Sequence, residues 1–379
     1  MLHDIVGVEG QRDPARYAVA GLLPAVAVAP SSTEEVAEVL RACNVEPLGC
    51  LVVGGMSRVS SYTTVERYDV ALDTERLQRF EHHTDDMMCT VGAGLRLDSV
   101  NQKLRARAQW LPWETEVIGP TTLGGAIATN CAGACEDGFG PPRRRVLELT
   151  AVTGLGEVIR VGAKVTKHSA GYAIHRLLCG SWGSLAVIAE ATVMLAAMPG
   201  RKQYRVHLSD WQDALHMADT AEGLIPHLVS FTITSDADSL SACFDVTGDD
   251  RTLTRAATTI RTATTPPSSS GPYQSAIRFE LDRSKANDFA RSLRNLYPDA
   301  TLRWRPISGV LWLLHSTPHQ DYTSALALAR ECGATWRAER GRCLERSTVS
   351  EAVRQIRLRV ASALDPHRTL IGGSLRGDA

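Results

Sequence analysis

The sequence predicts a mixed α+β protein, with two lobes in the first half of the chain and a second α+β domain after them. Short apolar strands alternate with amphipathic helices as far as about residue 199. Glycine-rich turns follow several of these strands. Beyond residue 200 the composition shifts toward Thr, Ser, Asp and Trp, which indicates a separate unit. A chain of 379 residues that is 44% apolar is long enough for two or three packed units.

The first lobe, expected over 1–67, opens with a strand–helix–strand pattern. Ser31 and Ser32 precede two glutamates in the manner of a capping box, and apolar residues then recur at helical spacing, which predicts a helix over 32–43. An apolar, β-branched strand over 51–53 follows and stops at two consecutive glycines.

The second lobe, expected over 68–199, alternates strands and helices, and a second domain and a C-terminal segment follow it. In the lobe we expect strands near 70–72, 89–91 and 185–195, a helix near 97–104, and a hairpin over 146–161. The cap or substrate domain covers 200–345, with helices near 209–223, 283–296 and 321–332. The amphipathic segment 349–364 lies in a C-terminal part, 346–379, that returns to the first domain.

Charge and composition narrow the class of protein. The formal charge of −1 comes from interspersed acids and bases, so no footprint for nucleic acid or an anionic membrane is expected. No apolar run approaches the roughly 20 residues of a membrane span, and residues 1–10 lack the pattern of a signal peptide, so we expect a cytoplasmic protein. The nine cysteines show no zinc-type or iron–sulfur spacing, so no metal site is expected.

Two glycine-rich segments are the first candidates for chemistry. In the first, the strand ending at Val53 runs into Gly54, Gly55, Met56 and Ser57. Residues without Cβ let backbone N–H groups converge on a pyrophosphate, although an ordinary hairpin turn is the competing interpretation. In the second segment, 119–133, small residues stand at nearly every position. Either a flat ligand lies against the main chain there, or a helix packs tightly.

A third segment, 170–190, reads as a short helix, a Gly/Ser turn and a buried strand. None of the three segments fits GxGxxG or a P-loop, so neither a nicotinamide Rossmann domain nor an NTPase is supported.

In their order and separation the three segments resemble the FAD-binding module of the vanillyl-alcohol oxidase and p-cresol methylhydroxylase (PCMH-type) superfamily. That family shows a GG-x-S/T turn, a P-x-T-x-GG-x-[IV]-A-x-N segment, and a K-x-x-x-GYDL segment that continues into GS-x-G-x-L-G. Here these correspond to 54–57, 120–130 and 167–188. Within the superfamily the chain most resembles the E subunit of bacterial glycolate oxidase, and the ending Asp365-Pro366 with Ile371-Gly372-Gly373 agrees with this.

The resemblance implies a two-lobed PCMH-type FAD-binding domain with a cap, and it assigns the cofactor contacts. The turn at 54–58 and the segment 120–129 would wrap the pyrophosphate, and 180–188 would lie near the flavin ring and the adenosine end. The implied contacts are Val53, Gly54, Gly55, Met56, Ser57, Arg58, Pro120, Thr122, Leu123, Gly124, Gly125, Ala128, Thr129, Gly133, Gly180, Ser181, Gly183, Val187 and Ile188. Relatives that attach FAD covalently often use a His in the first turn, where this chain has Met56 and Arg58, so we expect noncovalent FAD.

Oxidation of an alcohol by hydride transfer to flavin N5 needs a group that accepts the hydroxyl proton, and an Arg fork suits a substrate carboxylate. His168 is a candidate because it replaces the family's Asn beside the ring, and Tyr172 is a candidate flavin neighbour. Arg303 and His315 are candidates in the second domain. The competing interpretations are a solvated strand for the arginines, Arg278 and Arg305 included, and a core position for His315.

Three functions follow. The first is an FAD-dependent oxidase or dehydrogenase of a 2-hydroxy acid or related small alcohol. The second is an accessory FAD subunit of a glycolate-oxidase-like complex, with flavoprotein and iron–sulfur partner subunits. The third is a tailoring oxidase, or a degenerate FAD-fold scaffold, of a biosynthetic pathway. His168, Ala173 and Gly372 stand where the family has other residues, so the family's usual substrate is not carried over to this chain.

Overall fold

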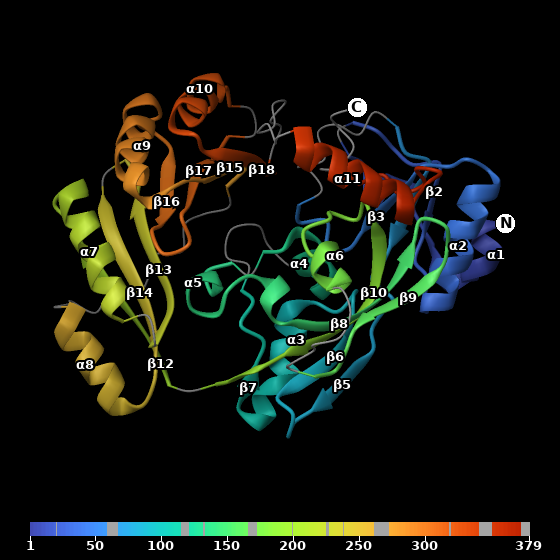
Figure 1. Ribbon diagram of the computed structural model, residues 1–379, viewed down its shortest axis with the longest axis horizontal. Coiled ribbons are helices and arrows are strands. Elements are labelled where there is room, and N and C mark those ends of the chain that lie inside the picture. The colour runs from blue at the N-terminus through green and yellow to red at the C-terminus, as the bar shows by residue number, and fades with distance from the viewer. Residues whose placement is uncertain are drawn as a thin grey trace.

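The computed structural model describes residues 1–372 except 20, 59–66, 115–120, 132, 166–172, 199, 225–226, 238, 261–272, 318–319 and 341–350, and at 339–340 it describes the backbone alone. Its four sheets and their helices form a mixed α+β architecture, which confirms the predicted fold class. Figure 1 shows the two lobes of the first half of the chain on the right and the second domain on the left.

The first lobe is a four-stranded sheet in the order β1-β2-β4-β3, with β4 parallel to both β2 and β3. The predicted capping box begins α2, because the Ser32 hydroxyl accepts a hydrogen bond from the N–H of Glu35 at 3.1 Å. The elements of this lobe are α1 (Leu2–Val6), β1 (Gln11–Arg12), β2 (Val26–Val28), α2 (Thr33–Val45), β3 (Cys50–Val53) and β4 (Val70–Asp73).

The second lobe is a five-stranded antiparallel sheet in the order β5-β6-β10-β8-β9, beside a two-stranded pair of β11 and β7. Gly156, at φ 77°, turns the chain in the hairpin that joins β8 to β9. The elements of this lobe are β5 (Phe80–His83), β6 (Met88–Gly92), α3 (Leu97–Leu104), β7 (Gln109–Trp110), α4 (Leu123–Thr129), α5 (Glu136–Phe139), β8 (Val146–Thr153), β9 (Val158–Gly162), α6 (Ile174–Leu178), β10 (Ala186–Met194) and β11 (Ala196–Ala197).

One apolar core joins the two lobes. It contains Val36 and Leu40 of the first lobe together with Val91 and Leu149 of the second. The C-terminal helix α11 (Glu351–Leu364) adds Ala361 to the same core, and residue 371 donates a hydrogen bond back to the carbonyl of Cys50 at 2.8 Å. The chain therefore returns to the first domain at its C-terminal end.

The second domain, called the cap below, is a seven-stranded antiparallel sheet in the order β12-β14-β13-β16-β17-β15-β18. Its four helices share one apolar core with one face of this sheet. Figure 1 shows these helices on the outer side of the molecule. The elements of the cap are β12 (Arg201–His207), α7 (Trp211–Gly223), β13 (Leu228–Ser235), β14 (Leu240–Thr247), α8 (Asp250–Ile260), β15 (Ser275–Glu280), α9 (Arg283–Leu296), β16 (Thr301–Arg305), β17 (Val310–His315), α10 (Thr323–Cys332) and β18 (Thr335–Arg340).

The inner face of the cap sheet carries arginines. Strand register places Arg337, Arg278, Trp312 and Arg303 in one row across four neighbouring strands. Arg305 points to the same face, because it alternates with Trp304 of the helix-side core. The lobes meet this face through α5, whose Asp137 carboxylate accepts a hydrogen bond from the N–H of Phe231 in β13 at 3.0 Å. The fold therefore brings an arginine-rich surface against the two lobes.

Candidate cofactor site

A cavity lies between the two lobes, where the three glycine-rich segments meet. Its walls come from the end of β3 and the turn after it, from α4, and from the turn that leads into β10. The volume of this cavity, including the solvent space at its open mouth, is about 690 Å³. A largely preformed, concave and mainly apolar space of this kind is the usual form of a cofactor site.

The turn after β3 presents backbone donors to this cavity. Among the described residues, the N–H groups of Gly54, Gly55 and Met56 make no backbone hydrogen bond. Met56 is one of the few non-glycine residues with positive φ, at 54°. Consecutive N–H groups on such a turn form a concave site for an anion. The turn therefore fits a pyrophosphate.

The start of α4 packs closely against this turn and against Ala93, which follows β6. A Cβ added at Gly54 would come within 2.6 Å of the Thr122 Oγ1, and one added at Gly124 within 2.8 Å of the Ala93 Cβ. The Thr122 hydroxyl itself caps α4 by accepting a hydrogen bond from the N–H of Gly125 at 3.2 Å. The second glycine-rich segment is thus a tightly packed helix that also lines the cavity, and the ligand that would lie against it stays a prediction.

A buried guanidinium closes one end of the wall. Arg58 is 7% exposed, and it donates to the Thr129 Oγ1 at 2.9 Å and to the Cys131 Sγ at 3.1 Å. The Thr129 hydroxyl donates in turn to the carbonyl of Gly125 at 2.8 Å. These bonds fix a positive charge and a hydroxyl beside the cavity without any mobile side chain.

The structure gathers most of the predicted cofactor residues around this one cavity. Those that line it are Val53, Gly54, Gly55, Met56, Ser57, Arg58, Thr122, Gly124, Gly125, Ala128, Thr129, Gly183 and Ile188. Five others are not among the lining residues, namely Leu123, Gly133, Gly180, Ser181 and Val187. Pro120, His168 and Tyr172 lie outside the described residues.

Five further lining residues were not named as contacts, although three of them, Thr121, Trp182 and Ala186, lie within the predicted segments 120–129 and 180–188; the other two are Val52 and Thr74. A second and more polar cavity adjoins the first at Gly54, Gly55, Met56 and Thr122. The buried pair of Tyr17 and Asp73 lines it, and the Tyr17 hydroxyl donates to the Asp73 carboxylate at 2.7 Å. The glycine turn therefore lies between an apolar cavity and a polar one. This arrangement suits a ligand in which a charged group joins two other parts.

On the cap side, the charges of three arginines act on one largely buried carboxylate, that of Glu136. Arg278 places its Nη2 3.9 Å from the Glu136 Oε2. Burial raises the pKa of Glu136, while the charges of Arg278, Arg305 and Arg337 act to lower it. Arg305 also donates to the carbonyl of Gly133, and Arg337 lies 5.7 Å from the centre of the Trp182 ring. The arginine face of the cap therefore reaches the wall of the cavity.

The other candidates in the cap lie on different sides of its sheet. Arg303 is on the inner face, with its guanidinium 5.8 Å from the centre of the Tyr273 ring. His315 is on the helix-covered face, with its ring edge-on to Tyr297 and Tyr322 at 5.6 Å from each. The structure therefore places His315 in the helix-side core and not at the cavity. The reason is that side chains alternate between the two faces of a strand, so His315 lies on the same face of β17 as Leu311 and Leu313, which belong to the helix-side core.

We expect His315→Phe to make the protein less sensitive to acid and to leave turnover unchanged. Burial lowers the pKa of His315 from its ordinary 6.5, with Asp299 acting the other way. The neutral ring therefore contributes stability above pH 6.5, and this contribution is lost as the pH falls. Urea unfolding between pH 5 and pH 8 measures the change. If the variant instead lost turnover at unchanged stability, His315 would act on the substrate.

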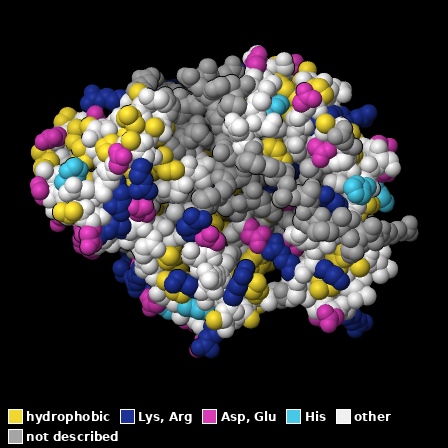
Figure 2. Space-filling view, turned by 180° about the vertical axis from the view of Figure 1, so that it is seen from behind, with side chains coloured by type: hydrophobic (Ala, Val, Ile, Leu, Met, Phe, Trp, Pro, Cys, Tyr) yellow, Lys and Arg dark blue, Asp and Glu magenta, His cyan; other side chains and the backbone are white. Residues whose placement is uncertain are grey.

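Two other kinds of site are absent from the part of the chain that the structure describes. No helix among the described residues is long and apolar enough to cross a membrane. Within those same residues, no group of three His, Cys, Asp or Glu side chains is placed to hold a metal ion. On the face shown in Figure 2, basic and acidic side chains are interspersed. The glycine-lined cavity and the adjoining arginine face are therefore the features that call for a function.

Comparison with known proteins agrees with this site. Residues 24–162 match a family model described as "FAD binding domain". The chain is 31% identical over 179 residues to the mitochondrial D-lactate dehydrogenase [cytochrome] of Arabidopsis thaliana, covering 47% of this chain and 31% of that protein. It is 26% identical over 193 residues to the glycolate oxidase subunit GlcD of Bacillus subtilis, covering 51% of this chain and 41% of that protein. The matches thus span less than half of each relative's length.

A solved structure of low sequence identity has a similar fold over most of this chain. An alkyldihydroxyacetonephosphate synthase structure superposes with a TM-score of 0.68 at 14% identity, covering 92% of this chain and 76% of the other. At that identity the likeness speaks for the fold alone. The glycolate oxidase relative is the D subunit, so the resemblance to the E subunit stays a prediction. The chain therefore shares the fold of that structure, with two lobes and a cap, and residues 24–162 are the part that matches the FAD binding domain.

Proposed function

We propose that this protein is an FAD-dependent oxidoreductase that oxidises the CH–OH group of a small 2-hydroxy acid, with noncovalent FAD in the cavity between the lobes. The observation that carries the proposal is the contact between the arginine face of the cap and the cavity wall, at Arg337 and Trp182. The names of the relatives, which include a D-lactate dehydrogenase and a glycolate oxidase subunit, support a 2-hydroxy acid.

FAD supplies the acceptor for the two electrons and the hydrogen of the substrate carbon. The chain's own residues have the remaining tasks. The N–H groups of Gly54 and Gly55 bind the pyrophosphate, and Arg58 adds a fixed positive charge. Arg278 and Arg337 orient the substrate, because a guanidinium fork matches the geometry of a carboxylate. Two donors on a rigid sheet hold the substrate C–H in one direction.

The proton acceptor is assigned by resemblance. His168 is the proposed acceptor of the hydroxyl proton, since an imidazole titrates near neutral pH, and Tyr172 is proposed as its neighbour at the ring. Arg303 is proposed as a further cation for the anionic substrate, because it shares the inner face with Arg278. His315 has no part in this proposal, because it lies in the helix-side core.

We expect the purified protein to be yellow and to bleach anaerobically with D-lactate or glycolate. The absorbance near 450 nm would fall on addition of the hydroxy acid and return with an artificial electron acceptor. L-Lactate and propionate serve as controls, because one has the other configuration and one has no hydroxyl group. A yellow protein that none of these acids bleaches would contradict the activity and leave the cofactor assignment standing.

A second candidate function is that of a subunit in a glycolate-oxidase-like complex. The match to GlcD, which is named as a subunit, favours it. In that case the protein would carry FAD and pass electrons to flavoprotein and iron–sulfur partner subunits. Copurification of those partners, together with bleaching that occurs only in their presence, would favour this function over the first.

A further inference from the structure

Trp182 has a backbone conformation that tryptophan seldom adopts. Its φ is 54°, and it stands between Gly180 at 87° and Gly183 at 73°. Its N–H donates to the carbonyl of Ala128 at 2.9 Å, and that of Gly180 donates to Ile127 at 3.1 Å, so the turn is tied to the end of α4. In this region Cβ crowds the following carbonyl, which favours glycine. Strain of this kind persists where the surroundings impose it, and it gathers at functional sites.

The side chain of Trp182 forms part of the cavity wall. It is 8% exposed, and it packs on Val53 and its neighbours in a small apolar cluster. Gly124, Gly125 and Ala128 line the same cavity and have little or no side chain. An indole beside such small residues leaves a space in which a second flat ring can lie against it. Aromatic pairs of this kind are favourable in offset or edge-on geometry.

A cation from the cap lies on the same indole. The Arg337 guanidinium is 5.7 Å from the centre of the Trp182 ring, which is within the range of a cation–π contact. Arg337 belongs to β18, where it pairs in register with Arg278 of the inner face. Trp182 is therefore a side chain of the cavity wall that the cap also contacts.

We propose that Trp182 stacks on one of the two aromatic ring systems of FAD, and that Arg337 holds the indole in place, so that cofactor binding and the position of the cap are coupled. This rests on the proposed function only in the identity of the cofactor. Trp182 is a binding residue in this proposal, and Arg337 acts on FAD through it as a positioning residue.

Equilibrium titrations of the protein with FAD, FMN and ADP, after removal of bound flavin, test the stack. Alanine substitution at base-stacking aromatics is worth roughly one to three kcal/mol, so we expect Trp182→Leu to weaken FAD binding by about 10-fold or more. Trp182→Phe keeps an aromatic ring, and we expect it to bind FAD within about threefold of the wild type. If ADP weakens with FAD, the stacked ring is the adenine, and if FMN weakens with FAD, it is the isoalloxazine.

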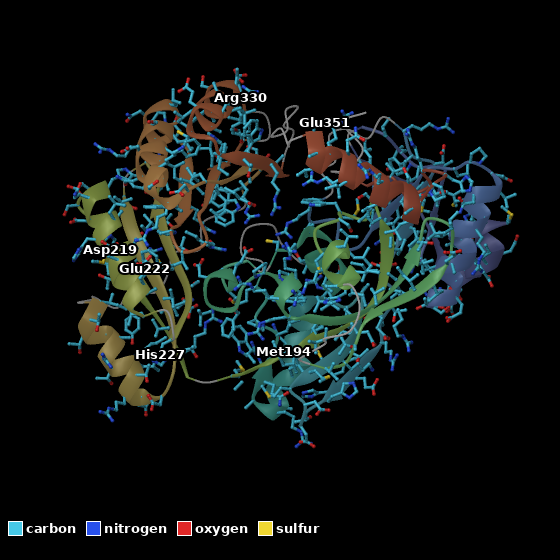
Figure 3. The ribbon with its side chains drawn as sticks, in the orientation of Figure 1. Met194, Asp219, Glu222, His227, Arg330 and Glu351 are labelled. Atoms are coloured by element: carbon cyan, nitrogen blue, oxygen red, sulfur yellow. The ribbon has the colours of Figure 1, made fainter. Side chains whose placement is uncertain are left out.

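The coupling is tested by Arg337→Met, which keeps the length of the side chain and removes its charge. A cation–π contact is worth about 0.5–1 kcal/mol, so Arg337→Met should weaken FAD binding by about threefold when Trp182 is present. Added to Trp182→Leu, the same substitution should weaken FAD binding no further. Arg330 is a matched control, since its guanidinium lies 5.4 Å from the centre of the Trp336 ring within the cap. Figure 3 shows Arg330 on α10, on the outer side of the cap. We expect Arg330→Met to leave FAD affinity unchanged.

Three results would overturn the proposal. They are an unchanged FAD affinity in Trp182→Leu, an effect of Arg337→Met that persists without Trp182, and a wild-type protein that binds none of the three ligands. If Trp182→Leu fails to fold, as a thermal melt would show, then Trp182→Phe and Arg337→Met carry the test. None of these titrations needs turnover, so a protein that binds FAD through Trp182 but oxidises no hydroxy acid would contradict the proposed function alone.

Discussion

Replacing Gly54 by alanine is expected to give a folded protein that binds FAD up to about 100-fold more weakly. The new Cβ would lie 2.6 Å from the Thr122 Oγ1, which is closer than a Cβ contact allows. Thr122 cannot move away freely, because its hydroxyl caps α4 through the N–H of Gly125. The turn must therefore shift and carry its N–H donors with it. Overpacking costs about 1–3 kcal/mol, which lowers the FAD affinity by up to about 100-fold.

The ratio of flavin to protein after purification measures this effect, followed by titration with FAD. Gly223→Ala is the matched control, because nothing lies within 4 Å of a Cβ added there, at the end of α7. Alanine is a better helix former than glycine, so we expect this control to be neutral or slightly stabilising. If Gly54→Ala retained a full complement of FAD, the pyrophosphate would not lie at this turn.

Local sequence signals predicted the elements that have their own capping or periodic pattern. Helix α2 is one example, because the hydroxyl of Ser32 and the carboxylate of Glu35 satisfy the backbone N–H groups at its start. Helix α9, predicted near 283–296, spans Arg283–Leu296, and it begins where the Asp282 carboxylate accepts a hydrogen bond from the N–H of Ser284. The hairpin of β8 and β9 likewise follows from its glycine turn.

For α4 the sequence left a packed helix and a ligand loop both open, because its alanines favour a helix and its glycines do not. Tertiary packing decides its conformation, with Gly124 pressed against Ala93. Trp182 lies in the predicted segment 180–188 but was not itself named as a contact, for a similar reason. The glycines on either side of it drew attention to the turn, while the direction of the indole depends on a positive φ that no local pattern reveals.

The arginine face could not be predicted from sequence spacing. Arg278, Arg303 and Arg337 lie in strands far apart in the chain, and only the register of β15, β16, β17 and β18 brings them into one row. Each of them alone resembles a solvated strand position. The side of the sheet on which His315 lies follows from period-two alternation once Leu311 and Leu313 are known to face the helices.

Replacing Arg278 by methionine is expected to reduce kcat/KM for the hydroxy acid by about 100-fold while FAD binding is kept. Loss of one member of a hydrogen-bonded charge pair at a binding site costs about 2–5 kcal/mol, and a difference of about 1.4 kcal/mol is tenfold. The same change removes one of the three guanidinium charges that act on Glu136, together with the ion pair of Arg278 and Glu280, so the free energy of unfolding is expected to fall by about 1–3 kcal/mol. Stopped-flow bleaching and urea unfolding measure the two effects.

A second substitution separates these two roles of Arg278. In Arg278→Met with Glu136→Gln, the buried carboxylate is gone, so most of the lost stability should return. The lost activity should not return, because the substrate carboxylate still lacks its guanidinium. Arg283→Met is the matched control on the other face of the sheet, since that arginine pairs with Asp219 and Glu222 of α7, labelled in Figure 3. Its pairs are solvent-exposed, so a loss of at most about 1 kcal/mol is expected there.

Recovery of activity in the double variant would mean that Arg278 acts by neutralising Glu136 and never touches the substrate. The carboxylate would then be bound elsewhere on the inner face, with Arg303 and Arg337 as the remaining candidates. Competitive inhibition by oxalate distinguishes the two cases, because oxalate reports carboxylate binding without turnover. An oxalate affinity that falls in Arg278→Met and stays low in the double variant places the substrate carboxylate at Arg278.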